Sequence, residues 1–365
     1  IYRLKYGEKP LTAKQIQEKL VENQTFLEYI SDNERYYLLA ISKKNITYKI
    51  CGDKQHIDSL ISLQNEHTIL QKSNSDINKQ IAKHLLPTTM FKELIISPDG
   101  KIHFLAFDML PTETEKLLVY EHPTQFAFSA NTYFNHQPNN EKKNVIAFYP
   151  DFSTSSYAVL NSTKEHNALK LFSNYNVYHQ QNATKSNFIK TANNTGIIHI
   201  ASHLIIDTIS PLYSYLVFQP SQNSTISIHE IWKLSTNTQL ISLACCQSNF
   251  GKQQSGEGVQ NFAWAFHYAG AHNILSTKWN APDKSTSAII SDFYRNLHAG
   301  ISKQEALRLA KISYLENADA IGKEPFFWAN LNLYGDKSAI VIHPYFFVKF
   351  WWIPVLVLLL CYLAI

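Results

Sequence analysis

The sequence predicts an α/β protein in which a mostly parallel sheet is covered by helices on both faces, followed by a C-terminal transmembrane helix. Short strands in the second half, such as 197–201 and 240–244, are apolar throughout, which is typical of parallel strands buried on both faces. Amphipathic helical patterns alternate with these strands. The final 21 residues, 345–365, are almost wholly apolar and match the length of a membrane-spanning helix.

The composition of the 365 residues excludes several classes of protein. With 45% apolar residues the chain can bury a large core, so it is not a disordered protein. Its 11 glycines and 13 prolines are too few for a collagen-like or Pro-rich chain. A net charge of +4, without runs of like charge, argues against a nucleic-acid partner. Four cysteines without a C-x-x-C pair favour reduced thiols, and no metal or cofactor is expected.

The first half is expected to mix helices, strands and turns. It opens with a helix whose capping box is Thr12 and Gln15. The elements that follow are identified from apolar spacing and turn residues. They are strands at 36–41 and 46–48, one or two helices between 57 and 86 divided near 73–75, strands at 94–96, 102–105 and 145–148, and a polar loop at 174–194.

The second half alternates strands and helices more regularly. Its strands are predicted at 197–201, 240–244 and 274–277, and its helices at 259–270, 289–297 and 302–315. Gly270 is expected to end the first of these helices. Ser302 and Glu305 are expected to form a capping box at the start of the last.

The C-terminal run 345–365 is predicted to be a membrane anchor. Lys349 can extend to the membrane interface, and the neighbouring aromatic residues suit the headgroup region. The alternative is a buried C-terminal core helix. Lys337 and Lys349 favour a cytoplasmic location for the main body. Because the chain starts at Ile1 without a methionine, we expect residues 1–10 to be the remnant of a truncated upstream region.

Two reactive side chains follow neighbouring apolar strands. His203 comes after strand 197–201 and Cys246 after strand 240–244. The carboxyl ends of parallel strands form the usual ligand site of such a sheet, so a histidine and a thiol placed there could act as base and nucleophile. On spacing alone the signal is weak, because buried cysteines and histidines are more often structural. His199 and His203 at i, i+4 do not predict zinc, since that spacing brings ligands together on a helix and this segment is a strand.

The chain resembles the CHAT-domain family of caspase-like cysteine peptidases. The resemblance rests on motifs spread over much of the sequence rather than on one pattern. They are Ser97-Pro98-Asp99-Gly100, His199-Ile200-Ala201-Ser202-His203, Leu243-Ala244-Cys245-Cys246-Gln247-Ser248, Gly256-Glu257-Gly258, Ala269-Gly270-Ala271, Ser276-Thr277-Lys278-Trp279, Asp292-Phe293-Tyr294, Ala306-Leu307-Arg308-Leu309-Ala310-Lys311, Phe327-Trp328-Ala329-Asn330 and Tyr334-Gly335-Asp336. The resemblance implies one caspase-like three-layer α/β/α domain over residues 11–340.

The resemblance also implies roles for individual residues. Cys246 would be the nucleophile and His203 the general base and acid, while Cys245 would point into the packing. The backbone N–H groups of Leu204 and Cys246 would form the oxyanion hole. Asp283 stands where related separases carry an acidic residue that meets a basic P1 side chain; the alternative is that it only caps the following helix.

Two departures from the family pattern bear on activity. Leu204 replaces a common glycine after the catalytic histidine, and Gln247 replaces the usual glutamate after the cysteine. We therefore expect a membrane-tethered cysteine endopeptidase, with a catalytically inactive scaffold or signalling module as the alternative. The expected partners are a protein or peptide substrate, an upstream TPR-type regulatory region and the lipid bilayer.

Overall fold

The computed structural model describes residues 9–90, 92–135, 144–193, 195–207, 209–220, 223–245, 252–254, 258–280, 282–336 and 340. The segment 345–365, predicted to span a membrane, and Cys246 both lie outside these ranges. Within them, no helix combines the length and apolar character that a membrane span requires.

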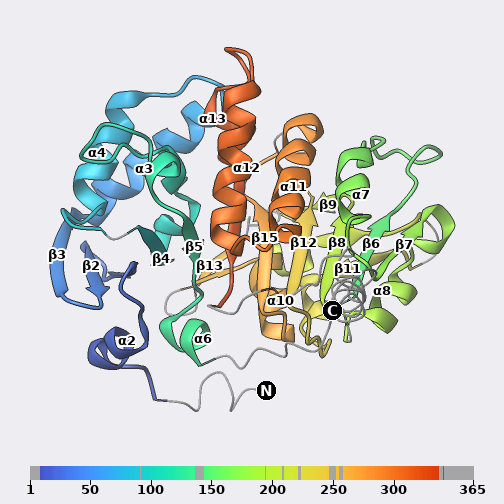
Figure 1. The fold of residues 1–365 in the computed structure, drawn as a ribbon, viewed down its shortest axis with the longest axis horizontal. Helices are drawn as coiled ribbons and strands as arrows, with labels where there is room; N and C mark the ends of the chain where they lie inside the picture. Colours follow the sequence, from blue (N-terminus) through green and yellow to red (C-terminus); the bar gives the residue numbers. More distant parts are fainter. Residues whose placement is uncertain are drawn as a thin grey trace, which may run out of the picture.

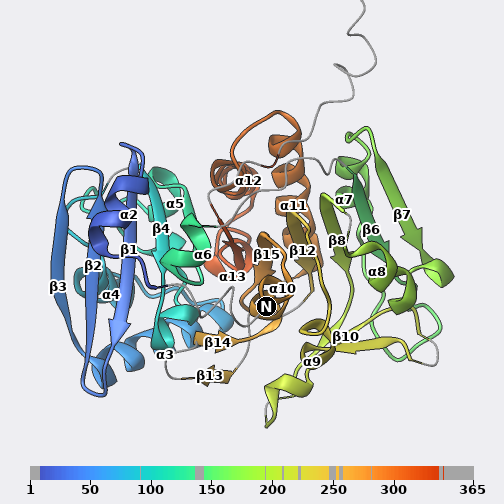
Figure 2. The same ribbon diagram turned by 90° about the horizontal axis from the view of Figure 1, so that it is seen from below.

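Eleven strands of the described part form one sheet, with β3 and β7 at its edges (Figure 2). In spatial order they are β3 (Ile46–Asp53), β2 (Arg35–Ser42), β1 (Gln24–Ser31), β4 (Glu93–Ser97), β5 (Thr124–Phe126), β16 (Leu331–Tyr334), β15 (Asn273–Thr277), β12 (Leu240–Ala244), β8 (Ile197–Ala201), β6 (Val145–Tyr149) and β7 (Tyr175–His179). The pairs β3–β2, β2–β1 and β15–β16 are antiparallel and the other neighbours are parallel. The predicted mostly parallel α/β sheet is therefore confirmed.

Two small antiparallel sheets and a set of helices complete the described structure. The small sheets consist of β9 (Leu204–Ile205), β10 (Tyr215–Val217) and β11 (Thr225–Ser227), and of β13 (Lys252–Gln254) and β14 (Gly258–Gln260). The α-helices are α2 (Ala13–Lys19), α3 (Lys54–Ile69), α4 (Ser75–Leu85), α5 (Leu118–Glu121), α6 (Ala130–Phe134), α7 (Thr163–Leu169), α8 (Lys185–Thr191), α9 (Ile228–Ile231), α10 (Phe262–Ala269), α11 (Asp283–His298), α12 (Lys303–Asn317) and α13 (Pro325–Trp328), and the 3-10 helices are η1 (Gly100–Phe104), η2 (Phe107–Met109), η3 (Gln180–Asn182) and η4 (Pro211–Tyr213).

The strands in the centre of the sheet are buried on both faces because their side chains alternate between two cores. In β8, Ile198 and Ile200 join the core that contains residues of α8 and α10. Ile197 and Ala201 join the opposite core, with residues of α7, α11 and α12. Figure 1 shows these two groups of helices on opposite sides of the strands. The helices of both groups leave only the strand ends of this region open for chemistry.

Several elements agree with the sequence prediction. The strands at 197–201 and 240–244 have the predicted bounds, and two helices, α3 and α4, occupy 57–86. The Thr12–Gln15 capping box is present. Gly270 ends α10 with a φ of 113°, in the left-handed region that favours glycine.

Three local predictions were wrong. The segment predicted as a strand at 102–105 is part of η1, because Asp99 caps a helical turn there. The predicted loop at 174–194 contains β7 and α8, and Phe188 of α8 is fully buried. The segment was predicted as a loop because the edge strand and the amphipathic helix in it are rich in polar residues. Ser302 does precede α12, but Glu305 pairs with Arg308 at 2.7 Å instead of closing a capping box.

Gly335, in the motif at the end of the described fold, fills a position that only glycine fits. Its φ is 149°, and an added Cβ would lie 2.1 Å from the Asn273 amide oxygen. Next to it, buried Asp336 forms an ion pair with Lys303 at 3.3 Å. This motif therefore has a structural role in joining β16 to β15.

Candidate active site

The strands β8 and β12 are parallel neighbours that end at the same edge of the sheet. Ala201, the last residue of β8, stands opposite Ala244, the last residue of β12. The chain reaches His203 two residues after Ala201. Cys246 comes two residues after Ala244 in the sequence and lies outside the described residues. The predicted adjacency of these two strand ends is confirmed, while the pairing of His203 with Cys246 stays a prediction.

His203 is held by contacts on several sides. Its Nε2 lies 2.7 Å from the carbonyl oxygen of Ala158. The Tyr157 ring stacks on the imidazole at 5.4 Å, and the Phe152 ring meets it edge-on at 4.7 Å. A carbonyl can only accept, so Nε2 carries the proton in this bond and the neutral ring presents Nδ1 as its acceptor. This bond leaves Nδ1 as the ring nitrogen that can take a proton from a nucleophile.

The loop that supplies these contacts was not identified from the sequence. Its start is fixed by Gln219, whose amide accepts from the Asp151 N–H at 2.7 Å and donates to the Asp151 carbonyl at 3.1 Å. A backbone carbonyl such as that of Ala158 leaves no residue-type signal. The aromatic side chains of Phe152 and Tyr157 were the only available hint.

The backbone around His203 is anchored to β10. The Val217 N–H donates to the His203 carbonyl at 2.9 Å, and the Ser202 hydroxyl donates to the Val217 carbonyl. Leu204 then begins β9 and pairs with Leu216. Leu204 is thus an extended, buried residue, and its position does not need the positive φ that glycine would provide.

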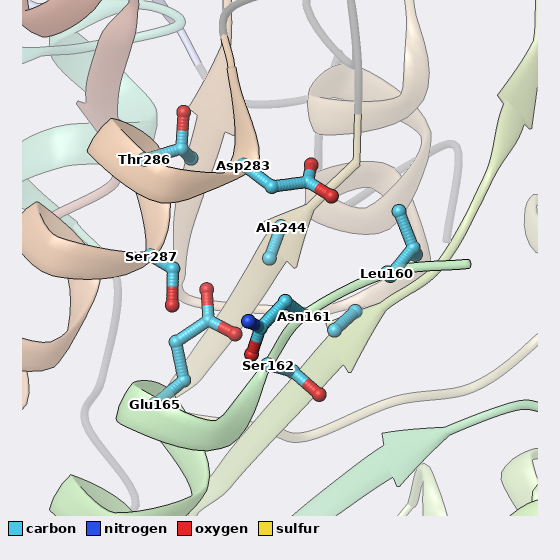
Figure 3. Close-up of a pocket in the computed structure, with 9 residues that line it drawn as sticks. Leu160, Asn161, Ser162, Glu165, Ala244, Asp283, Thr286 and Ser287 are labelled. Carbon is cyan, nitrogen blue, oxygen red and sulfur yellow. The ribbon is translucent and has the colours of Figure 1, made fainter. Parts of the chain in front are cut away.

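A small pocket lies beside the ends of β8 and β12 (Figure 3). Its volume of about 20 Å³ holds roughly one water molecule. It is lined by Leu160, Asn161, Ser162, Glu165, Ala201, Ala244, Asp283, Thr286 and Ser287. Figure 3 shows the carboxylates of Asp283 and Glu165 facing the space beside Ala244 and Asn161. The pocket is therefore acidic and adjoins both strand ends.

Asp283 is the first residue of α11, and Pro282 takes the N-cap position. The predicted alternative, that Asp283 caps this helix, is therefore wrong. The residue is exposed as a whole, yet its carboxylate lies against the pocket. Partial desolvation there raises the pKa of Asp283, the charge of Glu165 raises it further, and His203 opposes the shift. The pKa of Asp283 thus depends on the charges of both Glu165 and His203.

His199 lies deeper in the same region and is separate from His203. Its Nδ1 lies 3.0 Å from the Tyr294 hydroxyl, and its Nε2 lies 3.7 Å from the carboxylate of Glu165. The side chain is fully buried. Within the described ranges, no cluster of three or more His, Cys, Asp or Glu side chains could hold a metal ion. His199 is therefore a buried residue behind Glu165 and is bonded to Tyr294 rather than placed at the strand end.

Cys245 is buried at 2% exposure and its thiol points to the Ile200 carbonyl at 3.5 Å, in the core on the α10 side. This orientation was predicted. The Thr277 hydroxyl, at the end of β15, donates to the Cys245 carbonyl. Thr277 thereby fixes the chain just before Cys246. This residue belongs to the motif Ser276-Thr277-Lys278-Trp279, but the sequence did not indicate this role for it.

Comparison with known proteins agrees with this geometry. The family model described as "CHAT domain" matches residues 74–336. The chain belongs to the CHAT-domain family. The match falls inside the predicted domain range of 11–340, and the strands before residue 74 pair into the same sheet through β1 and β4.

Solved structures of a separase show a related fold at low sequence identity. A Saccharomyces cerevisiae separase, solved in complex with securin, superposes with a TM-score of 0.56 at 9% identity. The match covers 88% of this chain and 31% of the separase chain, so this chain spans about a third of that length. An Arg-specific cysteine proteinase, gingipain R, gives a TM-score of 0.45 at 11% identity, over 80% of this chain and 69% of that one. No curated protein sequence matches this chain.

Proposed function

We propose that the chain is a caspase-like cysteine endopeptidase that uses His203 as base and Cys246 as nucleophile. The observation that carries the proposal is the hydrogen bond that holds His203. The Nε2–H group donates to the Ala158 carbonyl, which leaves Nδ1 as the acceptor at the shared end of β8 and β12. Residue 246 follows the end of the neighbouring strand. Membership in the CHAT-domain family supports the same assignment.

The proposed reaction follows from these positions. Nδ1 of His203 takes the thiol proton of Cys246, and the thiolate attacks the scissile carbonyl. The resulting imidazolium returns the proton to the leaving amine. Water, deprotonated by the same nitrogen, then hydrolyses the thioester. The Ala158 carbonyl would stabilise the imidazolium through the proton it already accepts.

The oxyanion of the tetrahedral intermediate would be held by the backbone N–H groups of Leu204 and Cys246. The bond from Val217 to the His203 carbonyl makes residues 203 and 217 a hydrogen-bonded pair. Since such pairs alternate along an antiparallel ladder, the N–H of Leu204 points away from β10. This direction supports Leu204 as a donor, although it replaces the family's usual glycine.

Asp283 would receive a basic P1 side chain. The pocket, with room for roughly one water molecule, cannot enclose a lysine or arginine. We propose instead that the P1 cation reaches the exposed Asp283 carboxylate at the mouth of the pocket, where Glu165 adds a second negative charge.

The peptidase would be attached to a membrane through residues 345–365, with the described part on the cytoplasmic side and TPR-type repeats upstream. The apolar sequence of this segment supports the attachment. Membrane flotation of the full chain and of a chain ending at residue 340 tests it. Only the full chain should float with the vesicles.

The main test is covalent labelling with an acyloxymethyl ketone that carries Lys or Arg at P1. The intact chain should be labelled and the Cys246→Ala variant should not. The matched control is Cys245→Ala, which removes the neighbouring buried thiol and should keep labelling. Folded but unlabelled wild-type protein would support the alternative, an inactive scaffold. Labelling that survives Cys246→Ala would refute the choice of nucleophile.

A further inference from the structure

The edge strand β3 exposes an apolar row at one end of the sheet. Among the described strands, β3 has a neighbour only on its β2 side. Figure 2 shows it as the outermost element of that end, with α2 and α4 set back from it. Ile46, Tyr48 and Ile50 are 42%, 65% and 48% exposed. Their side chains share one face because they alternate along the strand.

The backbone groups of the same three residues point away from the protein. The Ser42 N–H donates to the Asn45 carbonyl at 2.8 Å, which makes these two residues a hydrogen-bonded pair of the β2–β3 ladder. Bonded and non-bonded pairs alternate. Thr47 and Lys49 therefore bond to β2, whereas the N–H and C=O groups of Ile46, Tyr48 and Ile50 face outward.

The usual protection of an edge strand is missing from this stretch. Natural proteins commonly place a lysine where another strand would otherwise pair. The only charged residue between Ile46 and Ile50 is Lys49, and its ammonium is turned inward. It donates to the carbonyls of Lys83 and Leu86 at the end of α4, at 2.8 Å each. The outward side of β3 therefore combines open backbone groups with an apolar row.

The apolar row continues onto the next strands of the sheet. The Tyr37 ring of β2 stacks on Tyr48 with centroids 6.5 Å apart. Ile30 of β1, opposite Tyr37, is 52% exposed. A strand added beside β3 would thus extend an apolar surface as well as a hydrogen-bond ladder.

We infer that β3 pairs with β3 of a second copy of this chain, antiparallel and about a two-fold axis at Tyr48. In this register Tyr48 stands opposite its own copy, and Ile46 stands opposite Ile50 of the second copy. All of these are outward-facing positions, so they form the hydrogen-bonded pairs of the new ladder. The two sheets join into one.

The charges at the ends of β3 single out a second copy as the occupant. The turn before the strand carries the exposed residues Lys43 and Lys44, and the other end carries the exposed residues Asp53 and Glu34. Antiparallel pairing brings this basic turn of one copy to the end of β3 that carries Asp53 in the other copy, where the exposed Arg35 offsets part of the negative charge. The two-fold axis repeats this contact, so opposite charges meet at both ends of the paired strands.

Sedimentation velocity of the full chain in detergent tests the dimer. Tyr48→Lys places like charges opposite each other at the axis and removes the aromatic pair, so the dimer should dissociate roughly tenfold more readily. The matched control is Ile321→Lys, at a residue with the same 65% exposure away from β3, which should dimerise like wild type. A monomeric wild type at micromolar concentration, or a dimer indifferent to Tyr48→Lys, overturns the proposal.

A cross-linking experiment tests the register. Hydrogen-bonded antiparallel partners have Cα atoms about 5.5 Å apart, within disulfide range, so oxidised Tyr48→Cys should form a covalent dimer. Thr47→Cys, one residue away, stands opposite Lys49 of the second copy and should not. Equal cross-linking of both variants indicates random collision and contradicts the pairing.

Charge substitution gives an independent check. Lys44→Glu, at the exposed turn residue nearer to β3, should weaken the dimer by bringing a carboxylate to the acidic end of the second copy. Lys43 is left in place because its ammonium donates to the Glu18 carbonyl at 2.9 Å. Adding Asp53→Asn should recover part of the loss, because asparagine keeps the helix-capping bond to the His56 N–H at 2.7 Å. A double variant no better than Lys44→Glu alone would show that the turn does not meet the Asp53 end of the second copy.

Discussion

The two ends of the large sheet differ in how much of their surface is covered by other elements. The strands from β15 to β6 are covered on both faces, so reactive groups can stand only where these strands end. At the other end, β3, β2 and β1 are antiparallel, and part of one face and one edge stay open. Burial on both faces thus directs chemistry to the strand ends, whereas partial exposure leaves a surface for association. Variants at the two ends should therefore change different properties of the protein.

The largest expected effect is on catalysis. His203→Ala removes the proposed base and should lower kcat/KM on a peptide with basic P1 by about 10³-fold, within the range for loss of a general base. The side chain is partly exposed, so the free energy of unfolding should change by less than about 1 kcal/mol. Activity within tenfold of wild type would remove His203 from the mechanism.

The covered strands should respond through stability instead. Phe148 of β6 is fully buried and packs against Tyr178, Phe188 and Phe218 with ring centroids 4.9 to 5.9 Å apart. Phe148→Ala should lower the free energy of unfolding by about 3–5 kcal/mol, measured by urea denaturation. Phe148→Leu keeps most of the volume and should cost less. A loss under about 1 kcal/mol for the alanine variant would show that this end is not tightly packed.

The antiparallel end contains a half-buried acid, Glu28, that should make the stability of the fold depend on pH. Burial raises the pKa of Glu28 on β1 to about 7; a hydrogen bond from Ser97 opposes this and the Asp99 charge adds to it. The folded protein therefore keeps a proton that the unfolded chain loses near pH 4.5. Stability falls as pH rises from about 4.5 through 7, because the folded state must then hold a buried charge.

Glu28→Gln removes this charge. The variant should be more stable than wild type by about 1–3 kcal/mol at pH 8 and nearly equal to it at pH 4. Urea denaturation at both pH values measures the difference. Glu22→Gln, at an exposed position in the preceding turn, should change neither value. A constant difference across pH would mean that Glu28 titrates normally.

The smallest effect separates association from folding. In the monomer, Tyr48→Lys should alter the free energy of unfolding by less than about 0.5 kcal/mol, since the side chain is 65% exposed. A loss above 1 kcal/mol, measured by urea denaturation below the dimerisation range, would mean that Tyr48 serves the fold rather than an interface.

The sequence was most informative where burial is uniform. The bounds of β8 and β12 could be predicted because their residues, apart from His199, are apolar or small enough to face one of two cores. The strand β7 was missed because an edge position tolerates polar residues such as Asn176 and His179. Local patterns also cannot tell which competing bond wins, as with Glu305, which pairs with Arg308 rather than with the helix end.

Only some of the groups at the candidate site could be predicted from the sequence. His203 lies after the end of β8, as expected, and Asp283 at the start of α11 is close enough for the charge of His203 to act on its pKa. The Ala158 carbonyl and the buried Glu165 were not predicted. Both reach the site from a connection that is distant in sequence, and a backbone group has no residue type to recognise.

The position of β16 has a consequence for synthesis of the chain. This strand, at residues 331–334, lies between β5 and β15 and links the two parts of the sheet. Until it leaves the ribosome, the strands β3 to β5 and the strands β15 to β7 have no shared ladder. The strands of each group are complete earlier, so each ladder can form during translation before β16 is made. A nascent chain halted before residue 331 should therefore hold two separate ladders, joined only by side-chain contacts such as the shared core and the ion pair of Lys311 with Asp108.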